Sequence, residues 1–348
     1  MTFYNNRVSI VNMSKDELYL FRNIKEKIIM NYYNIEGIGN EDIIVKDALG
    51  EFDVLINGED ELYLIYQNID NELIMLTIDK KVIQGSNLAK EGLSEVYELN
   101  LIKAGDYMNI MYLVRNPMEN HIFEIHHHLL REEEWINYNV EKIKINKVLN
   151  PIKVWGEDNK IILSYYNENQ ICIKEFNLDS MEWEESIILT DNKNKLYMDL
   201  IKEKEYIHLV YSEYIGGNLV IKYERFLYDG YYLNKDLEEV LSNEGSPSHP
   251  TLLIHDNILW VVWKESLGLY STYSLDIGAT WSPIYLWKES KTIDYVRYKY
   301  IEGKPQVNNK LDYSFGTLYP DIKFLGFGAL DNVEEVVKKN QIYKFPRL

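Results

Sequence analysis

The chain has 348 residues and a formal net charge of −18, and 46% of its residues are hydrophobic. This length suits two average domains or one large all-β domain, and the 29 tyrosines favour strands. The negative charge repels phosphate backbones and no local basic patch offsets it, so nucleic acid is not an expected partner.

The single cysteine and the first residues bear on the compartment. Cys172 stands between two isoleucines, which predicts a small buried apolar side chain, and a lone thiol without an intrachain disulfide fits a reducing compartment. Met1–Asp16 contains no apolar core of signal-peptide length, and no run reaches the roughly 20 apolar residues of a membrane span. We expect a cytoplasmic protein; a secreted one that had lost its signal peptide would read the same way.

An apolar strand recurs along the chain and ends each time in Asn or Glu. The steps between these ends are 45, 48, 51, 46 and 52 residues, a period that fits a four-stranded propeller blade and not a helical repeat. These second strands are Leu18–Asn23, Leu62–Asn68, Met111–Asn116, Ile161–Asn167, Ile207–Glu213 and Ile258–Glu265. They are apolar on both faces, which predicts blades stacked face to face.

Each repeat also contains a strand before and a strand after this apolar strand. The first strands are expected at Arg7–Met13, Glu51–Asn57, Val96–Ile102, Pro151–Trp155, Leu196–Lys202 and His249–His255. The third strands are expected at Lys27–Tyr33, Leu73–Ile78, His121–His126, Ile171–Phe176, Leu219–Phe226 and Leu269–Ser274.

The end of the chain is less regular. Tyr295–Ile301, Asp312–Leu318 and Ile322–Phe327 predict three strands of a seventh blade, so seven blades are favoured and six are the alternative. Beyond the propeller, residues 1–328, we expect a helical tail, residues 329–348. Its helix is placed at Asn332–Lys339, with Asp331 as N-cap and basic residues in the last turn.

One turn carries a complete local motif of the form Ser-x-Asp-x-Gly-x-Thr-Trp. It comprises Ser274, Asp276, Gly278, Thr280 and Trp281. Gly278 permits a positive φ, and the Asp276 carboxylate can accept hydrogen bonds from backbone amides of the turn. Trp281 supplies an apolar body beneath the hairpin. We expect these residues to be structural.

This motif resembles the Asp-box (BNR repeat) of the sialidase-like β-propeller superfamily. The resemblance implies an all-β propeller and, in sialidases, three arginines that hold a substrate carboxylate, a Tyr–Glu nucleophile pair and an Asp acid/base. Arg7-Val8-Ser9 is the nearest match to the family's first arginine element but lacks its proline. Arg115, Arg297 and Tyr295 are candidates for the middle arginine, the late arginine and the nucleophile.

The ends of the second strands are expected to gather at the top face, the face at which the first strands begin. Arginine there suits carboxylates or sulfates, because its paired donors match paired oxygens. A solvated rim is the plain alternative. The candidate ligand-binding residues are Arg22, Gln67, Arg115, Tyr166, Ser212, Lys264, Glu213 and Glu265, with Tyr295 and Arg297 from the last repeat.

The run His126-His127-His128 places two histidines on one face of a strand, as a pair of metal ligands would be. No carboxylate or cysteine at a fixed spacing completes such a site. Solvated or edge-strand histidines are the expectation, and no metal or cofactor is predicted.

A full scaffold without a full catalytic set favours a non-catalytic propeller that binds a protein or carbohydrate ligand through its top face. The alternative is a sialidase-like glycoside hydrolase or lyase that acts on an acidic sugar. That function predicts arginine and carboxylate side chains that converge in one deep pocket.

Overall fold

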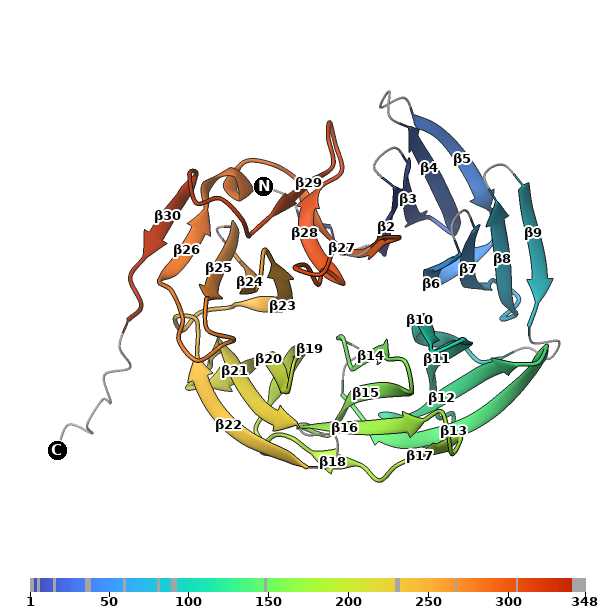
Figure 1. The fold of residues 1–348 in the computed structure, drawn as a ribbon, viewed down its shortest axis with the longest axis horizontal. Coiled ribbons are helices and arrows are strands. Elements are labelled where there is room, and N and C mark those ends of the chain that lie inside the picture. The colour runs from blue at the N-terminus through green and yellow to red at the C-terminus, as the bar shows by residue number, and fades with distance from the viewer. Residues whose placement is uncertain are drawn as a thin grey trace.

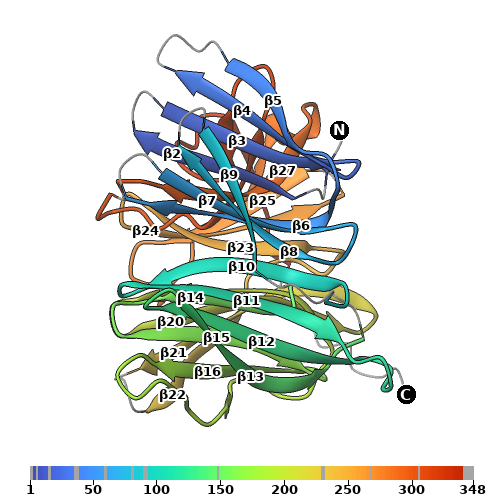
Figure 2. The same cartoon turned by 90° about the vertical axis from the view of Figure 1, so that its right-hand side faces the viewer.

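The computed structural model describes residues 3–4, 7–14, 17–34, 39–58, 61–79, 82–88, 93–146, 149–228, 232–266, 268–304 and 306–339. Antiparallel sheets are arranged around a central opening, like the blades of a propeller (Figure 1). Figure 2 shows the ring from the side, with β10–β13 toward the viewer. The all-β prediction is confirmed; among the described residues the only helical element is the short 3-10 helix η1, Lys288–Lys291.

Three sheets have four strands each, in chain order from the opening outward. Their strands are β6 Ala48–Asn57, β7 Glu61–Asn68, β8 Leu73–Asp79 and β9 Val82–Asn87; β10 Val96–Ala104, β11 Tyr107–Arg115, β12 Ile122–Arg131 and β13 Glu134–Lys144; β19 Lys195–Glu203, β20 Tyr206–Ile215, β21 Asn218–Tyr228 and β22 Leu233–Val240.

Two sheets have five strands. In one, the outer strand is divided, since β17 and β18 both pair with β16. In the other, the late strand β30 pairs antiparallel with β26. Their strands are β14 Ile152–Gly156, β15 Lys160–Asn167, β16 Gln170–Asn177, β17 Glu182–Trp183 and β18 Ile187–Ile188; β23 Ser248–His255, β24 Ile258–Glu265, β25 Gly268–Ser274, β26 Ile284–Trp287 and β30 Val333–Val336.

The two ends of the chain meet in an eight-stranded sheet. Its strands, in order across the sheet, are β29 Lys323–Leu325, β28 Tyr313–Thr317, β27 Tyr295–Glu302, β2 Val8–Ser14, β3 Glu17–Ile24, β4 Lys27–Asn34 and β5 Gly39–Val45, and β1 Phe3–Tyr4 also pairs with β27. The pairing of β2 with β27 is parallel, with Ser9 opposite Lys299, and it closes the ring.

The expected first, second and third strands are confirmed to within a few residues at their ends. The burial prediction also holds: Leu64, Ile65, Val261 and Val262 are all fully buried, although neighbouring residues of a strand point to opposite faces. Cys172 is buried, as expected, with a free thiol.

The expected helix at Asn332–Lys339 is wrong. Residues 333–336 form β30 along the open edge of β26, with Val336 opposite Ile284. An unpaired sheet edge supplies backbone partners, and valine favours a strand, so tertiary pairing prevails over the helical pattern of charges. The rest of the expected tail, residues 340–348, lies outside the described residues.

The histidine run also differs from the expectation of an edge strand, because β12 pairs on both sides, with β11 and β13. His127 is fully buried and bonds to Asn109 at 3.0 Å. The rings of His126 and His128 both stack with that of Tyr112, at 5.5 and 5.3 Å between ring centroids. No group of three or more His, Cys, Asp or Glu side chains suited to a metal occurs in the part of the chain that the structure describes.

Candidate ligand site along the propeller axis

The first strand of each sheet lines the central opening, where three cavities follow one another along the axis. The upper mouth, at the start of the first strands, has a volume of about 200 Å³ and is lined by Arg7, Glu51, Glu98, His249, Arg297 and Tyr313, among others. The lower cavity, at the end of the same strands, has a volume of about 560 Å³. A gap of about 40 Å³ lies between the two.

Buried acids on one first strand satisfy backbone amides of the next. Asp53 accepts a hydrogen bond from the Leu101 amide at 2.7 Å, and Asp199 accepts one from the Leu252 amide at 2.9 Å. The strands that carry these two amides, β10 and β23, are edge strands of their sheets, so their inward amides need partners from another blade. These carboxylates therefore hold neighbouring blades together.

Lysines neutralise these acids and form a layer of ion pairs between the upper mouth and the lower cavity. The Lys299 ammonium lies 2.8 Å from Asp53, and the Lys153 ammonium lies 3.2 Å from Asp199 and also pairs with Asp312. Burial alone would lower the pKa of Lys153, but the two carboxylates outweigh it and raise that pKa above its usual range. We call these five residues the ion-pair layer.

Three first strands carry the same β-bulge where they enter the upper mouth. The register shifts between Tyr97 and Asn100, between Leu196 and Asp199, and between Ser248 and Thr251. In each bulge one residue has a positive φ: Glu98 at 52°, Tyr197 at 54° and His249 at 52°. Because a bulge re-aims a side chain, the repeated irregularity turns Glu98 and His249 toward the upper mouth.

Arg297 is held in a fixed position at the upper mouth. Its Nε donates to Thr251 Oγ1 at 3.0 Å, and its guanidinium carbon lies 4.1 Å from the centroid of the Tyr313 ring. Among the described residues it forms no ion pair with a carboxylate. A guanidinium stacked in this way offers paired N–H donors that suit a carboxylate or sulfate oxygen pair.

The two glutamates of the upper mouth, Glu51 and Glu98, have different surroundings. Glu51 forms an ion pair with Arg7 and accepts the Leu99 amide at 3.1 Å. Glu98 lies 3.8 Å from Arg7. Burial raises the pKa of Glu98 to about 7, with Arg7 opposing and Glu51 reinforcing the rise. Burial and the nearby Arg297 lower the pKa of His249 to about 3, so this imidazole is neutral at pH 7.

The residues proposed from the sequence do not gather around one opening; only Arg297 lies at the upper mouth. Gln67 and Ser212 are fully buried: Gln67 bonds to the Val96 amide of β10 at 2.9 Å, and Ser212 bonds to the carbonyl of Pro247, directly before β23, at 3.0 Å. Three of the others have partners nearby: Arg22 bonds to Asn31 and Glu41, Glu213 pairs with Lys222, and Glu265 accepts a bond from the Trp263 indole. Tyr166 and Tyr295 are buried, Lys264 is half-buried and Arg115 is exposed.

This correction has a physical reason. The second strand stands one position outward from the axis, and in two blades its upper end bonds to the connection to the next blade, Gln67 to Ser94 and Ser212 to Pro247. The residues that sequence reasoning missed lie on the first strands. The sequence signal they share is a polar residue between apolar neighbours in each first strand: Ser9, Asp53, Asn100, Lys153, Asp199, Thr251 and Lys299.

The turn of the Ser-x-Asp-x-Gly-x-Thr-Trp motif has the expected bonds and lies away from the upper mouth. The Asp276 carboxylate accepts hydrogen bonds from the Thr280 amide at 2.8 Å and the Thr280 hydroxyl at 2.6 Å, and Ser274 Oγ accepts the Gly278 amide at 2.7 Å. Trp281 packs edge-on against Tyr223, with 4.8 Å between ring centroids. These residues brace the hairpin between β25 and β26.

Comparisons with known proteins support the fold only. No protein-family model and no curated protein sequence matches the chain. A lectin from Burkholderia pseudomallei is similar in structure, with a TM-score of 0.54 and 10% identity over 85% of this chain and 90% of the lectin. A prolyl endopeptidase has a TM-score of 0.50 and 9% identity over 91% of this chain but 46% of its own. A fucose-specific lectin from Aleuria aurantia has a TM-score of 0.48 and 13% identity over 81% and 95%. The chain is thus similar to propeller-like proteins in architecture.

Proposed function

We propose that the protein is a non-catalytic propeller of seven blades that binds an acidic glycan at the upper mouth, its top face. The eight-stranded sheet is counted as two blades, β27–β29 and β2–β5, which are joined by the parallel pairing at Ser9 and Lys299; with the five other sheets this gives seven. A chain of net charge −18 gains nothing from general attraction to an anion, so a specific group must hold it.

Arg297 carries this proposal. It is fixed by Thr251 and Tyr313, so little side-chain entropy is lost when a carboxylate or sulfate binds. Arg7, in contrast, already has Glu51 as its partner. The neutral imidazole of His249 and the protonated form of Glu98 can serve hydroxyl groups of a sugar ring beside the anionic group. The structural likeness to a lectin makes carbohydrates the first ligand class to test.

The test is a glycan array that contains neutral, uronate, sialylated and sulfated sugars, followed by calorimetry on the hits. We expect binding to acidic glycans, and at least a tenfold loss for Arg297→Gln, about 1.4 kcal/mol, as for a hydrogen bond to a charged group. Binding of neutral glycans with equal affinity, or of a protein ligand alone, would refute the acidic-glycan proposal.

The second candidate is a sialidase-like hydrolase or lyase, and one observation favours it. Two arginines, a carboxyl group with a pKa of about 7 and the Tyr313 ring converge on the upper mouth. Turnover of a panel of fluorogenic sialosides and uronosides tests this function directly. Cleavage that disappears in Glu98→Gln but survives in Glu265→Gln would replace the non-catalytic proposal.

A further inference from the structure

The larger of the axial cavities is not the one that holds Arg297. The lower cavity, with a volume of about 560 Å³, falls in the range of small-molecule sites. It lies at the end of the first strands, and the connection between β27 and β28 contributes part of its wall through Asn309, Lys310 and Leu311. The ion-pair layer separates it from the upper mouth, so the two are different sites.

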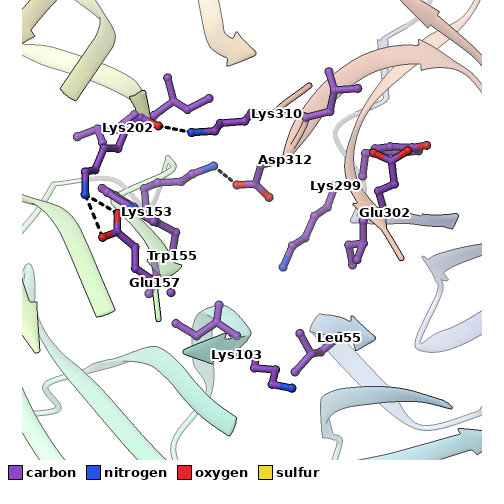
Figure 3. Close-up of a pocket in the computed structure, with 18 of the residues that line it drawn as sticks. Leu55, Lys103, Lys153, Trp155, Glu157, Lys202, Lys299, Glu302, Lys310 and Asp312 are labelled. Atoms are coloured by element: carbon purple, nitrogen blue, oxygen red, sulfur yellow. Dashed lines mark hydrogen bonds and ion pairs between the residues drawn. The ribbon is translucent and has the colours of Figure 1, made fainter. Parts of the chain in front are cut away.

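The walls of the lower cavity are mainly apolar. They include Leu55, Ile102, Val154, Ile201 and Leu311, and the half-buried indole of Trp155 stands among them (Figure 3). An indole beside aliphatic side chains offers a flat surface to an aromatic or sugar ring. A ligand with a flat apolar body matches this lining better than a fully hydrated ion does.

The charges of the cavity are unlike those of the whole chain. Five lysines and three acids line it, whereas the chain as a whole has 37 basic and 55 acidic residues. Four of the lysines are paired: Lys153 and Lys299 within the ion-pair layer, Lys202 with Glu157 at 2.9 Å, and Lys310 with Glu203 at 2.7 Å. These pairs fix the charged walls and leave little net charge.

Lys103 is different. It lies on β10 at the edge of the lower cavity (Figure 3), its side chain is exposed, and in the described parts of the chain it forms no ion pair with a carboxylate. On another wall, Glu302 also has no described ion-pair partner. Among the described residues that line the cavity, those without an ion-pair partner are therefore one cation, Lys103, and one anion, Glu302, on different walls.

We infer that the lower cavity is a second binding site, for a small organic acid with a flat ring body. Its single anionic group pairs with Lys103, its ring lies against Trp155 and the aliphatic wall, and a hydroxyl or amino group of the ligand donates to Glu302. A second negative charge would meet Glu302 and is disfavoured. This site does not depend on the function proposed for the upper mouth.

The test uses a matched pair of fluorescent probes, 8-anilinonaphthalene-1-sulfonate and neutral N-phenyl-1-naphthylamine, which share their ring system. We expect the sulfonate to bind one site per folded chain. Lys103→Gln should weaken the sulfonate about fivefold and leave the neutral probe unchanged, the size expected for one exposed charge contact. Lys46→Gln, which removes an exposed lysine outside the cavity, is the control and should change neither.

Two further variants complete the design. Leu55→Trp narrows the cavity and should weaken the binding of both probes, with folding verified by circular dichroism and urea unfolding. Arg297→Gln should leave both probes bound, which distinguishes this site from the upper mouth. Equal effects of Lys103→Gln and Lys46→Gln, or an unchanged affinity of both probes for a folded Leu55→Trp protein, would overturn the inference.

Discussion

The carboxylate of Asp53 on β6 accepts hydrogen bonds from the Lys299 ammonium on β27 at 2.9 and 2.8 Å, across 246 residues of sequence. The same carboxylate accepts the Leu101 amide of β10. One buried acid thus connects a blade from the end of the chain with two blades from its beginning. This contact supports ring closure, together with the parallel pairing of β2 and β27.

Removal of one member of this pair should therefore destabilise the whole ring. Asp53→Ala leaves a half-buried ammonium and a buried amide without partners, and we expect a loss of about 3–5 kcal/mol in the free energy of unfolding. The exposed pair Lys291–Glu334 is the control, and Lys291→Met should change this free energy by less than about 1 kcal/mol. Urea unfolding compares the two; equal effects would contradict the role assigned to Asp53.

Substitution of Gly278 tests how tightly the hairpin between β25 and β26 packs on the core. Its φ is +79°, and a Cβ added there would lie 1.9 Å from Tyr223 Oη, which bonds to His208 at 2.7 Å in the buried core. Gly216 has a φ of +61° but no atom within 4 Å of such a Cβ. Both alanine substitutions carry the backbone strain of about 1 kcal/mol, and Gly278→Ala should add about 1–3 kcal/mol from overpacking. Thermal unfolding of both variants measures the difference.

The pKa of Asp276 tests the hydrogen bonds of the same turn. Hydrogen bonds from the Thr280 side chain and backbone lower its pKa to about 2. A lowered folded pKa stabilises the turn above the unfolded value, about 4, and this stabilisation is lost as the pH falls through 2. Carbon-13 NMR should show the carboxyl titrating near 2 in the native chain and closer to 4 in Thr280→Val. An unchanged pKa in the variant would mean that Thr280 is not the cause.

Glu98 gives the opposite pH dependence. Its pKa is about 7 in the folded chain, above the unfolded value of about 4.3, so the folded state binds more protons between these pH values. Its contribution to stability is complete below about pH 4 and declines as the pH rises toward 7. Glu98→Gln should remove this slope, and urea unfolding at pH 4, 6 and 8 checks it. A steeper decline with pH in the variant would contradict the assignment.

The sequence predicted most strands because their signal is local. Runs such as Leu62–Asn68 are apolar on both faces, because a strand buried between two blades contacts apolar side chains on both sides. The prediction of a helix at Asn332–Lys339 was wrong because the structure of this segment depends on a partner strand that is distant in sequence. The segment forms a strand because it pairs with the open edge of β26, and no pattern within the segment indicates that edge.

The candidate site was harder to predict than the fold. Arg297, a candidate from the sialidase resemblance, lines the upper mouth, but Gln67 and Ser212 were expected at an opening that they do not reach. Which strand faces the axis is a property of the closed ring. The bulge that turns Glu98 toward the upper mouth is a backbone irregularity, and its sequence, Tyr97-Glu98-Leu99, carries no mark of it.

Calorimetric titration of an acidic glycan into three proteins tests the central claim most directly. These are the native chain, Arg297→Gln and Arg115→Gln, the last of which removes the same charge from an exposed position away from the axis. We expect one site per chain, at least a tenfold loss of affinity in Arg297→Gln and no change in Arg115→Gln. Equal affinities for all three proteins, or an equal loss in both variants, would contradict a ligand site built on Arg297.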